Sequence, residues 1–179
     1  MTLMSPENTV NTGDAGRTET AFTIDTSSIK FGPNVTAETG YELDRLGASR
    51  VMAVTDPGMS GGTAVATAVE SLKRTNIDFV VFDQVSVEPT DVSFKEATEF
   101  AVNGKFDRFL PVGRGSSIDT AEAVNLHSTD PAEFLEYVNA PIGKGQSVPG
   151  NLKPLVAVPT TAVTGSETTG VATPLLHSL

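Results

Sequence analysis

Short apolar runs alternate with amphipathic stretches along most of the chain. Four runs rich in Val, Ile, Leu and Phe predict buried strands, at residues 50–56, 77–82, 107–112 and 155–158. Between these runs, apolar residues recur every three or four positions and predict helices, at about residues 33–46, 60–74, 90–101 and 118–126. Strands that alternate with helices need right-handed crossovers and therefore lie parallel. The pattern predicts an α/β fold with a doubly wound, mostly parallel sheet.

The pattern is weaker towards both ends of this core. Alternating apolar and polar residues from Phe22 to Ile29 predict an edge strand, and a short helix is expected near residues 131–137 within a Gly/Pro-rich region. Residues 1–20 contain almost no large apolar side chains, so we expect a disordered tail rather than a signal peptide or a transit helix. One domain is expected over residues 21–172.

Composition narrows the choice of partners and compartment. The chain has 179 residues, of which 39% are hydrophobic, enough for one sizeable core. Lys plus Arg number 12 and Asp plus Glu 22, a net charge of −10, which disfavours nucleic acid as a partner. No apolar run approaches the roughly 20 residues of a membrane span, so no membrane partner is expected. The chain has no Cys, which fits a reducing compartment, and we expect a cytoplasmic protein.

Candidate chemistry lies in the loops that follow the predicted strands, because doubly wound sheets bind ligands at the carboxyl ends of their strands. Asp56 ends the first of these strands and can accept hydrogen bonds from ribose hydroxyls or an adenine amine. The same residue precedes Pro57 and Gly58, where an Asp commonly caps a turn. Both interpretations of Asp56 stay open.

A glycine-rich turn, Gly-Arg-Gly-Ser-Ser at residues 113–117, joins the third strand to a helix. Glycines let a backbone approach a phosphate, and the start of a helix favours an anion. The turn has neither the Lys of a Walker loop nor the spacing of the Rossmann fingerprint, so alone it is weak evidence for phosphate binding. The loop at residues 159–170 places six hydroxyls beside the last strand, which suits phosphate or ribose oxygens but also a solvated loop.

Four segments in this order resemble landmarks of the iron-containing alcohol dehydrogenases. They read VEPTD, VGRGSSIDTAEAVNL, YVNAPIGKG and LKPLVAVPTTAVTGSETTGVA, and the resemblance covers about residues 20–172. VEPTD and YVNAPIGKG point to the hydroxyacid-oxoacid transhydrogenase branch. In that family an N-terminal Rossmann-like domain binds NAD(P), and a helical C-terminal domain supplies one Asp and three His to a divalent metal, usually iron.

The resemblance implies roles for the loops described above. Asp56 is expected near the adenosine, the glycine-rich turn around the pyrophosphate, and the Thr pair after the last strand along the cofactor. Asp119 matches an Asp on the side of the turn that faces the active site. The candidate cofactor-binding residues are therefore Asp56, Gly113, Arg114, Gly115, Ser116, Asp119, Thr160 and Thr161. No catalytic residue is assigned.

Three positions depart from the family pattern. Arg114 and Val163 stand where glycine is expected, and each costs free energy if its backbone needs a positive φ. Arg114 could instead add a cation beside the phosphates, so both interpretations of this residue stay open. Glu122 replaces a Lys and is expected to repel phosphate. We therefore expect weak NAD binding, which Arg114→Gly together with Val163→Gly would improve.

The C-terminal metal domain is expected to be missing. Residues 173–179 diverge from the family, and the chain has two His, His127 and His177, so no metal site is expected. The preferred hypothesis is a truncated iron-containing alcohol dehydrogenase-like oxidoreductase acting on alcohols or 2-hydroxyacids, inactive alone. Its partners would be a dinucleotide and either a separately encoded C-terminal domain or a second copy of the chain. The alternatives are a non-catalytic nucleotide-binding or sugar-phosphate-binding module, or a gene fragment.

Overall fold

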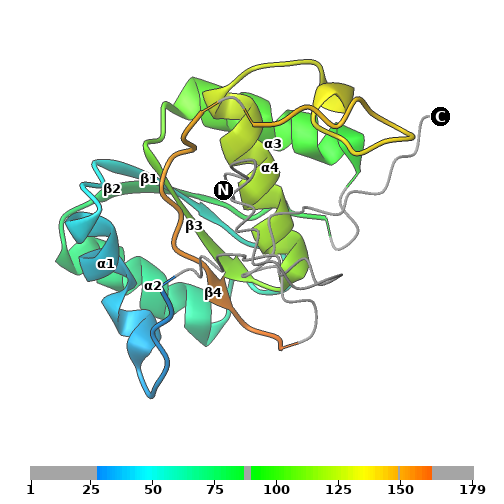
Figure 1. The fold of residues 1–179 in the computed structure, drawn as a ribbon. Helices are drawn as coiled ribbons and strands as arrows, with labels where there is room; N and C mark the ends of the chain where they lie inside the picture. Colours follow the sequence, from blue (N-terminus) through cyan, green and yellow to red (C-terminus); the bar gives the residue numbers. More distant parts are fainter. Residues whose placement is uncertain (1–27, 87–89, 149, 163–179) are drawn as a thin grey trace, which may run out of the picture. The chain divides into compact units, whose positions relative to one another are not determined.

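A computed structural model describes residues 28–86, 90–148 and 150–162 of the chain. Four parallel strands form one sheet in these residues, in the order β2-β1-β3-β4 (Figure 1). The strands are β1 (Arg50–Val54), β2 (Asp78–Phe82), β3 (Arg108–Gly113) and β4 (Val158–Pro159). The helices are η1 (Val35–Glu38), α1 (Thr39–Arg45), α2 (Thr63–Arg74), α3 (Asp91–Gly104), α4 (Gly115–Thr129) and η2 (Phe134–Glu136). All of them belong to one compact unit that begins at Phe31.

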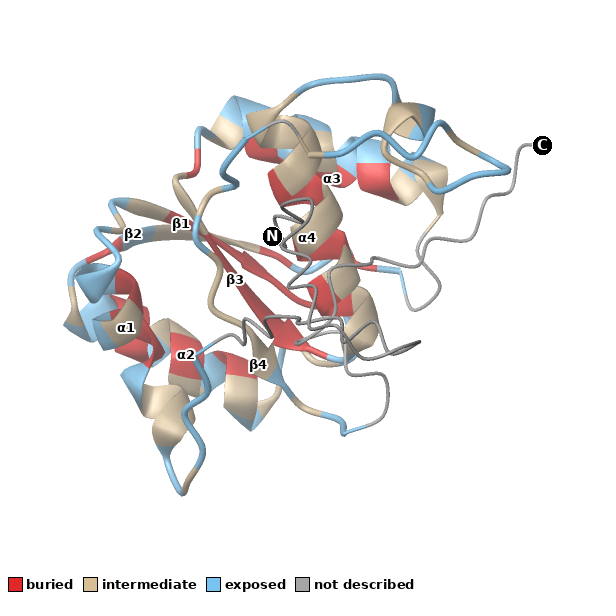
Figure 2. Cartoon of the chain, in the orientation of Figure 1, coloured by how far each residue is buried: buried red, intermediate tan, exposed pale blue. Residues whose placement is uncertain are grey.

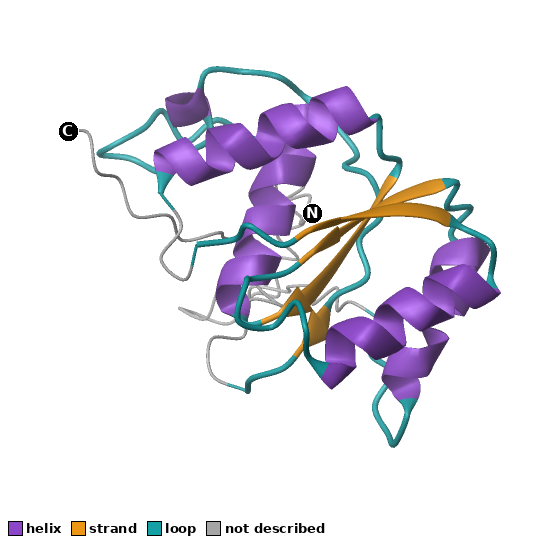
Figure 3. Ribbon diagram, turned by 180° about the vertical axis from the view of Figure 1, so that it is seen from behind, coloured by secondary structure: helices purple, strands orange, loops and turns teal. Residues whose placement is uncertain are grey.

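Helices cover both faces of the sheet, which confirms the predicted doubly wound α/β class (Figure 3). The side chains of the strands alternate between two buried clusters, as a pleated strand requires. Val51 packs in the cluster with α1 and α2, whereas Met52, the next residue, packs in the cluster with α3 and α4. β1 and β3 are buried over most of their length and form the centre of the sheet (Figure 2).

The predicted elements differ from the structure mainly at their ends. The last strand is shorter than predicted, with a single bridge at Leu155 before β4. α4 starts at Gly115, three residues before the predicted start, because Ser117 and Ile118 already donate to the carbonyl of Arg114. The helix expected near residues 131–137 is the 3-10 turn η2.

The N-terminal edge strand and both tails are largely untested. Residues 28 and 29 carry no strand, and the rest of the predicted edge strand lies outside the described residues, as do residues 1–20 and 173–179. Within the described part, no helix is long and apolar enough to cross a bilayer.

Local contacts fix the start of α3 and the end of α1. Thr90 caps α3: its hydroxyl accepts from the amide of Ser93, and the hydroxyl of Ser93 accepts from the amide of Thr90. In the turn that follows α1, Gly47 has φ 74°, a left-handed conformation that glycine adopts without strain. The helix therefore stops where the sequence predicts.

α1 and α2 touch through a glycine. The amide of Gly40 donates to the hydroxyl of Ser71 at 2.9 Å, and a Cβ on Gly40 would overlap the backbone carbonyl of Ser71. The carbonyl is part of α2 and cannot move without shifting the helix. The packing of α1 against α2, on one face of the sheet, therefore requires glycine at this position.

We predict that Gly40→Ala lowers the free energy of unfolding by about 1–3 kcal/mol, because overpacking outweighs the gain in helix propensity. Gly61→Ala is the matched control, since a Cβ there meets no atom within 4 Å. Urea denaturation of both variants checks this. Equal stability of the two would show that the α1–α2 contact does not require glycine.

Candidate functional site

The loops singled out in the sequence meet at one edge of the sheet. Asp56 follows β1, the glycine-rich turn follows β3, and Thr160 follows β4. Because the strands are parallel, these loops share the carboxyl edge. The amide of Thr160 donates to the carbonyl of Gly113 at 2.8 Å, and Oδ2 of Asp56 lies 3.9 Å from the position that a Cβ on Gly113 would take. The predicted clustering of these residues is therefore present, while their role in cofactor binding stays a prediction.

Of the two interpretations of Asp56, the structure confirms the turn cap, while the contact with ribose or adenine stays a prediction. Its Oδ1 accepts from the amide of Met59 at 3.1 Å, so the residue does cap the turn after β1. Only 2% of the residue is exposed, and its other carboxylate oxygen, Oδ2, is buried. This oxygen has no hydrogen-bond partner. A buried carboxylate oxygen without a donor is costly, so Oδ2 is suited to accept from a ligand.

Gly113, the last residue of β3, packs directly against the first turn of α4. A Cβ on Gly113 would lie 2.5 Å from Oγ and 2.9 Å from Cβ of Ser117, too close for real atoms. Glycine is therefore needed here so that the first turn of α4 can sit against the end of the strand. The sequence analysis attributed this glycine to phosphate approach and missed the packing reason.

The first turn of α4 presents backbone N–H groups towards the carboxyl edge. Gly115 and Ser116 are the first two residues of this 15-residue helix, and both are partly exposed. The first amides of an α-helix have no acceptor within the helix, and the helix dipole adds partial positive charge. This end of α4 is therefore suited to an anion.

The backbone strain that a positive φ would cause at Arg114 is absent. Its backbone has φ −80° and ψ 179°, an extended conformation that any L-residue adopts. The side chain is exposed beside the start of α4, so it adds a cation to the site without a backbone cost. Val163, the other departure at a glycine position, lies outside the described residues.

The two Thr residues after β4, Thr160 and Thr161, differ in burial. Oγ1 of Thr160 is buried and has no hydrogen-bond partner, whereas Thr161 is exposed. Ser117, which the sequence analysis did not select, has a fully buried hydroxyl that likewise has no partner. Three such oxygens lie at this edge, on Asp56, Ser117 and Thr160, and each can bind a ligand or a water.

Glu122 and Asp119 lie one turn apart on α4, and both are partly buried. Burial raises the pKa of Glu122 to about 8, and the charge of Asp119 adds to the shift. Glu122 is therefore mostly protonated at neutral pH, and the expected repulsion of phosphate by this residue is largely absent there. One oxygen of Asp119 is buried without a hydrogen bond, although the residue does take part in an electrostatic interaction.

His127 lies near the end of α4, and its ring packs against two aromatic side chains. Its ring stacks on Phe134 with centroids 5.5 Å apart and meets the edge of Tyr137 at the same distance. Burial lowers the pKa of His127. His177 lies outside the described residues, which contain no group of three or more His, Cys, Asp or Glu able to hold a metal ion. Iron therefore does not fit the donors of this part of the chain.

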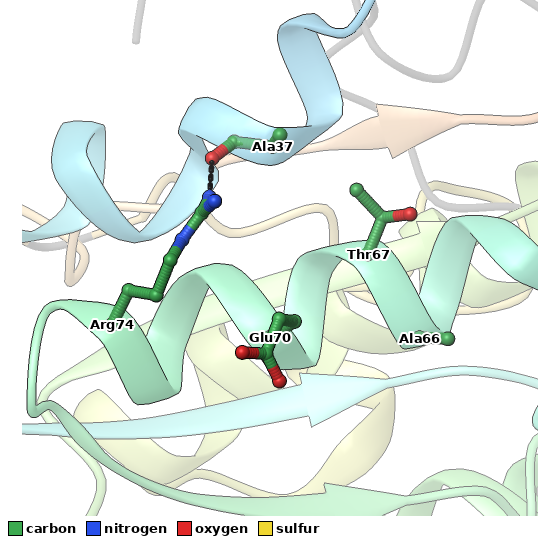
Figure 4. A pocket seen from close by; sticks show the side chains of 5 residues that line it. All are labelled: Ala37, Ala66, Thr67, Glu70 and Arg74. Carbon is green, nitrogen blue, oxygen red and sulfur yellow. Dashed lines mark hydrogen bonds between the residues drawn. The ribbon is translucent and has the colours of Figure 1, made fainter.

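A shallow groove of about 410 Å³ lies between η1 and α2 (Figure 4). Its lining residues are Ala37, Ala66, Thr67, Glu70 and Arg74. Arg74 already donates to the carbonyl of Ala37, and none of the lining residues belongs to the loops at the carboxyl edge. The groove is a less suitable ligand site than that edge.

Comparisons with known proteins agree with this geometry. Residues 26–175 match the family described as iron-containing alcohol dehydrogenase. The chain is 54% identical over 156 residues to a mitochondrial hydroxyacid-oxoacid transhydrogenase of Bos taurus and 51% identical over 156 residues to that of Homo sapiens. These matches cover 87% of the chain and 34% and 33% of the relatives.

Solved structures show the same fold. A 1,3-propanediol oxidoreductase superposes with a TM-score of 0.79 at 26% identity, over 88% of this chain and 40% of that protein. An alcohol dehydrogenase from Oenococcus oeni gives 0.79 at 29% identity, over 88% and 41%.

Two features of the relatives bear on the expectations from sequence. The chain spans about a third of the length of the curated relatives it matches. Those relatives are named as mitochondrial proteins, so the expected cytoplasmic location is wrong. The expectation depended on the lack of Cys and on the composition of the first residues, and neither identifies a compartment.

The raised pKa of Glu122 gives a testable pH dependence. From its ordinary value of 4.5 up to about 8, the unfolded chain releases this proton while the folded chain keeps it. The stability of the wild type should therefore fall over this range relative to Glu122→Gln, by on the order of a few kcal/mol in total. Below about 4.5 the two proteins should be equally stable.

Urea midpoints measured across this pH range check the expectation. The control is Glu70→Gln, which removes an exposed carboxylate from α2 and should show no such divergence from the wild type. A constant difference between Glu122→Gln and the wild type at all pH values would contradict the assignment.

Proposed function

Because the chain belongs to the iron-containing alcohol dehydrogenase family, we propose that it is the nucleotide-binding part of a hydroxyacid-oxoacid transhydrogenase. The high identity to proteins with this name supports the branch. The single observation that carries the proposal is the set of buried oxygens without partners around Gly113, on Asp56, Ser117 and Thr160. We also propose a mitochondrial location, in line with the names of the relatives.

The dinucleotide is held by the loops at the carboxyl edge. The amides of Gly115 and Ser116 bind the pyrophosphate at the start of α4, and Arg114 adds its cation from the surface. Oδ2 of Asp56 accepts from the ribose hydroxyls of the adenosine half. Thr160 and Thr161 line the part of the cofactor that crosses β4, and the bound nicotinamide supplies the hydride acceptor.

Asp56 favours NAD over NADP. A phosphate on the 2′ oxygen would bring a dianion against a buried carboxylate oxygen that has no cation on it. Like charges at short range in a poorly solvated site repel strongly. Asp119 lies in the second turn of α4 and is partly buried, and we assign it to the side of the site that faces the substrate.

Oxidation of a hydroxyacid needs more than this edge of the sheet. The alkoxide that forms as hydride leaves is stabilised in such enzymes by a Lewis acid, and the described residues lack the donors for iron. We therefore propose that the metal ligands come from a polypeptide segment outside the described residues.

Dinucleotide binding tests the proposal directly. Calorimetry with NAD, NADP and a sugar phosphate should rank NAD first. Arg114→Ala should weaken NAD binding several-fold at low ionic strength and much less in molar salt, because an exposed cation is screened. Arg45→Ala, which removes an exposed Arg from α1, is the control and should change nothing. Tighter binding of the sugar phosphate would instead favour a sugar-phosphate module.

The purified chain alone should not turn over alcohols or 2-hydroxyacids when supplied with NAD and Fe²⁺ or Zn²⁺. The reason is the missing set of metal donors in the described residues. A spectrophotometric assay of NADH formation measures this. Metal-dependent turnover by the chain alone would overturn it, and activity that appears only with a separately expressed partner segment would support it.

A further inference from the structure

Two of the unpartnered oxygens flank the same small space. Oγ of Ser117 lies 2.5 Å, and Oδ2 of Asp56 3.9 Å, from the point that a Cβ on Gly113 would occupy. Both atoms are buried, and neither has a hydrogen-bond partner. One is a hydroxyl that can donate, and the other is a carboxylate oxygen that can only accept when ionised. The two groups are therefore chemically complementary across a space that only glycine leaves open.

We propose that Ser117 is a positioning residue for Asp56, its hydroxyl holding Oδ2 either directly after rotation about its Cα–Cβ bond or through one bridging water. Because Oγ lies 2.5 Å and Oδ2 3.9 Å from the same point, the two atoms are at most about 6.4 Å apart, a span that a change of rotamer or a single water can bridge. With Oδ1 already held by the amide of Met59, a hydrogen bond at Oδ2 fixes the plane of the carboxylate. Each carboxylate oxygen still has a lone pair for a ligand.

This contact joins the two halves of the site. Ser117 belongs to the first turn of α4, which is suited to an anion, whereas Asp56 ends β1 and is suited to ribose hydroxyls. Ser117 thus couples the orientation of the ribose-binding carboxylate to the position of the phosphate-binding helix. The inference rests on the proposed dinucleotide function, and its test separates the two.

A double-mutant cycle with Asp56→Asn tests the coupling. Ser117→Ala should weaken NAD binding roughly tenfold, the effect of losing one hydrogen bond to a charged group, and should leave the affinity for inorganic pyrophosphate unchanged. In the Asp56→Asn background Ser117→Ala should have almost no further effect. Ser117→Cys keeps the size of the side chain but donates weakly, so it should behave like Ser117→Ala and exclude a packing effect.

Ser128→Ala removes a hydroxyl from the other end of α4 and is the matched control, with unchanged affinity for both ligands. Equal losses of NAD and pyrophosphate affinity in Ser117→Ala would mean that Ser117 binds phosphate itself, which overturns the proposal. Independent, multiplying effects of the two substitutions would also overturn it.

The same cycle on the ligand-free chain keeps the test decisive if the wild type fails to bind NAD. Ser117→Ala and Asp56→Asn should each lower the midpoint of thermal unfolding. The midpoint of the double variant should be no lower than that of the less stable single variant. Additive shifts would contradict the contact between Ser117 and Asp56. Non-additive shifts without NAD binding would keep the contact and reject the dinucleotide function.

Discussion

The close approach of α4 to the end of β3 organises the carboxyl edge. Gly113 allows it, because any side chain there would overlap Ser117. The contact fixes where the first turn of α4 points, and the hydrogen bond from Thr160 to the carbonyl of Gly113 brings the loop after β4 to the same place. Asp56 reaches this point from β1. Gly113 thus allows the ends of β1, β3 and β4 to meet. The proposed phosphate-binding start of α4 and the proposed ribose-binding Asp56 lie side by side as a result.

The charges of the site depend on burial more than on residue type. Glu122 looks unfavourable for a phosphate ligand when read as an ionised side chain, but burial and Asp119 raise its pKa to about 8. A residue other than glycine at position 114 would disfavour anion binding if its backbone were strained. The φ of Arg114 is −80°, which is ordinary, and its side chain is exposed. Of the departures from the family pattern that lie in the described residues, neither argues against an anion at the start of α4.

Periodicity was sufficient to predict the layers of the fold, because apolar strands and amphipathic helices carry strong local signals. The runs at residues 50–56 and 107–112 both became central strands. The short run at residues 155–158 predicted a longer strand than β4, because an edge strand depends on contacts that periodicity does not encode. Ser117 was missed for a similar reason. A second Ser in a polar turn carries no sign that its hydroxyl is buried against Gly113, which is a property of the packed helix. The conformation at Arg114 was also beyond the sequence, since φ follows from the geometry of the helix start.

The central claim is that a dinucleotide binds at the carboxyl edge around Gly113. Titration of the ¹⁵N-labelled chain with NAD, followed by the backbone amide signals, tests it most directly. The account predicts that the largest shifts occur at Asp56, Gly113, Gly115, Ser116 and Thr160. Shifts centred instead on Ala37, Thr67 and Arg74, in the groove between η1 and α2, or no shifts at saturating NAD, would contradict it.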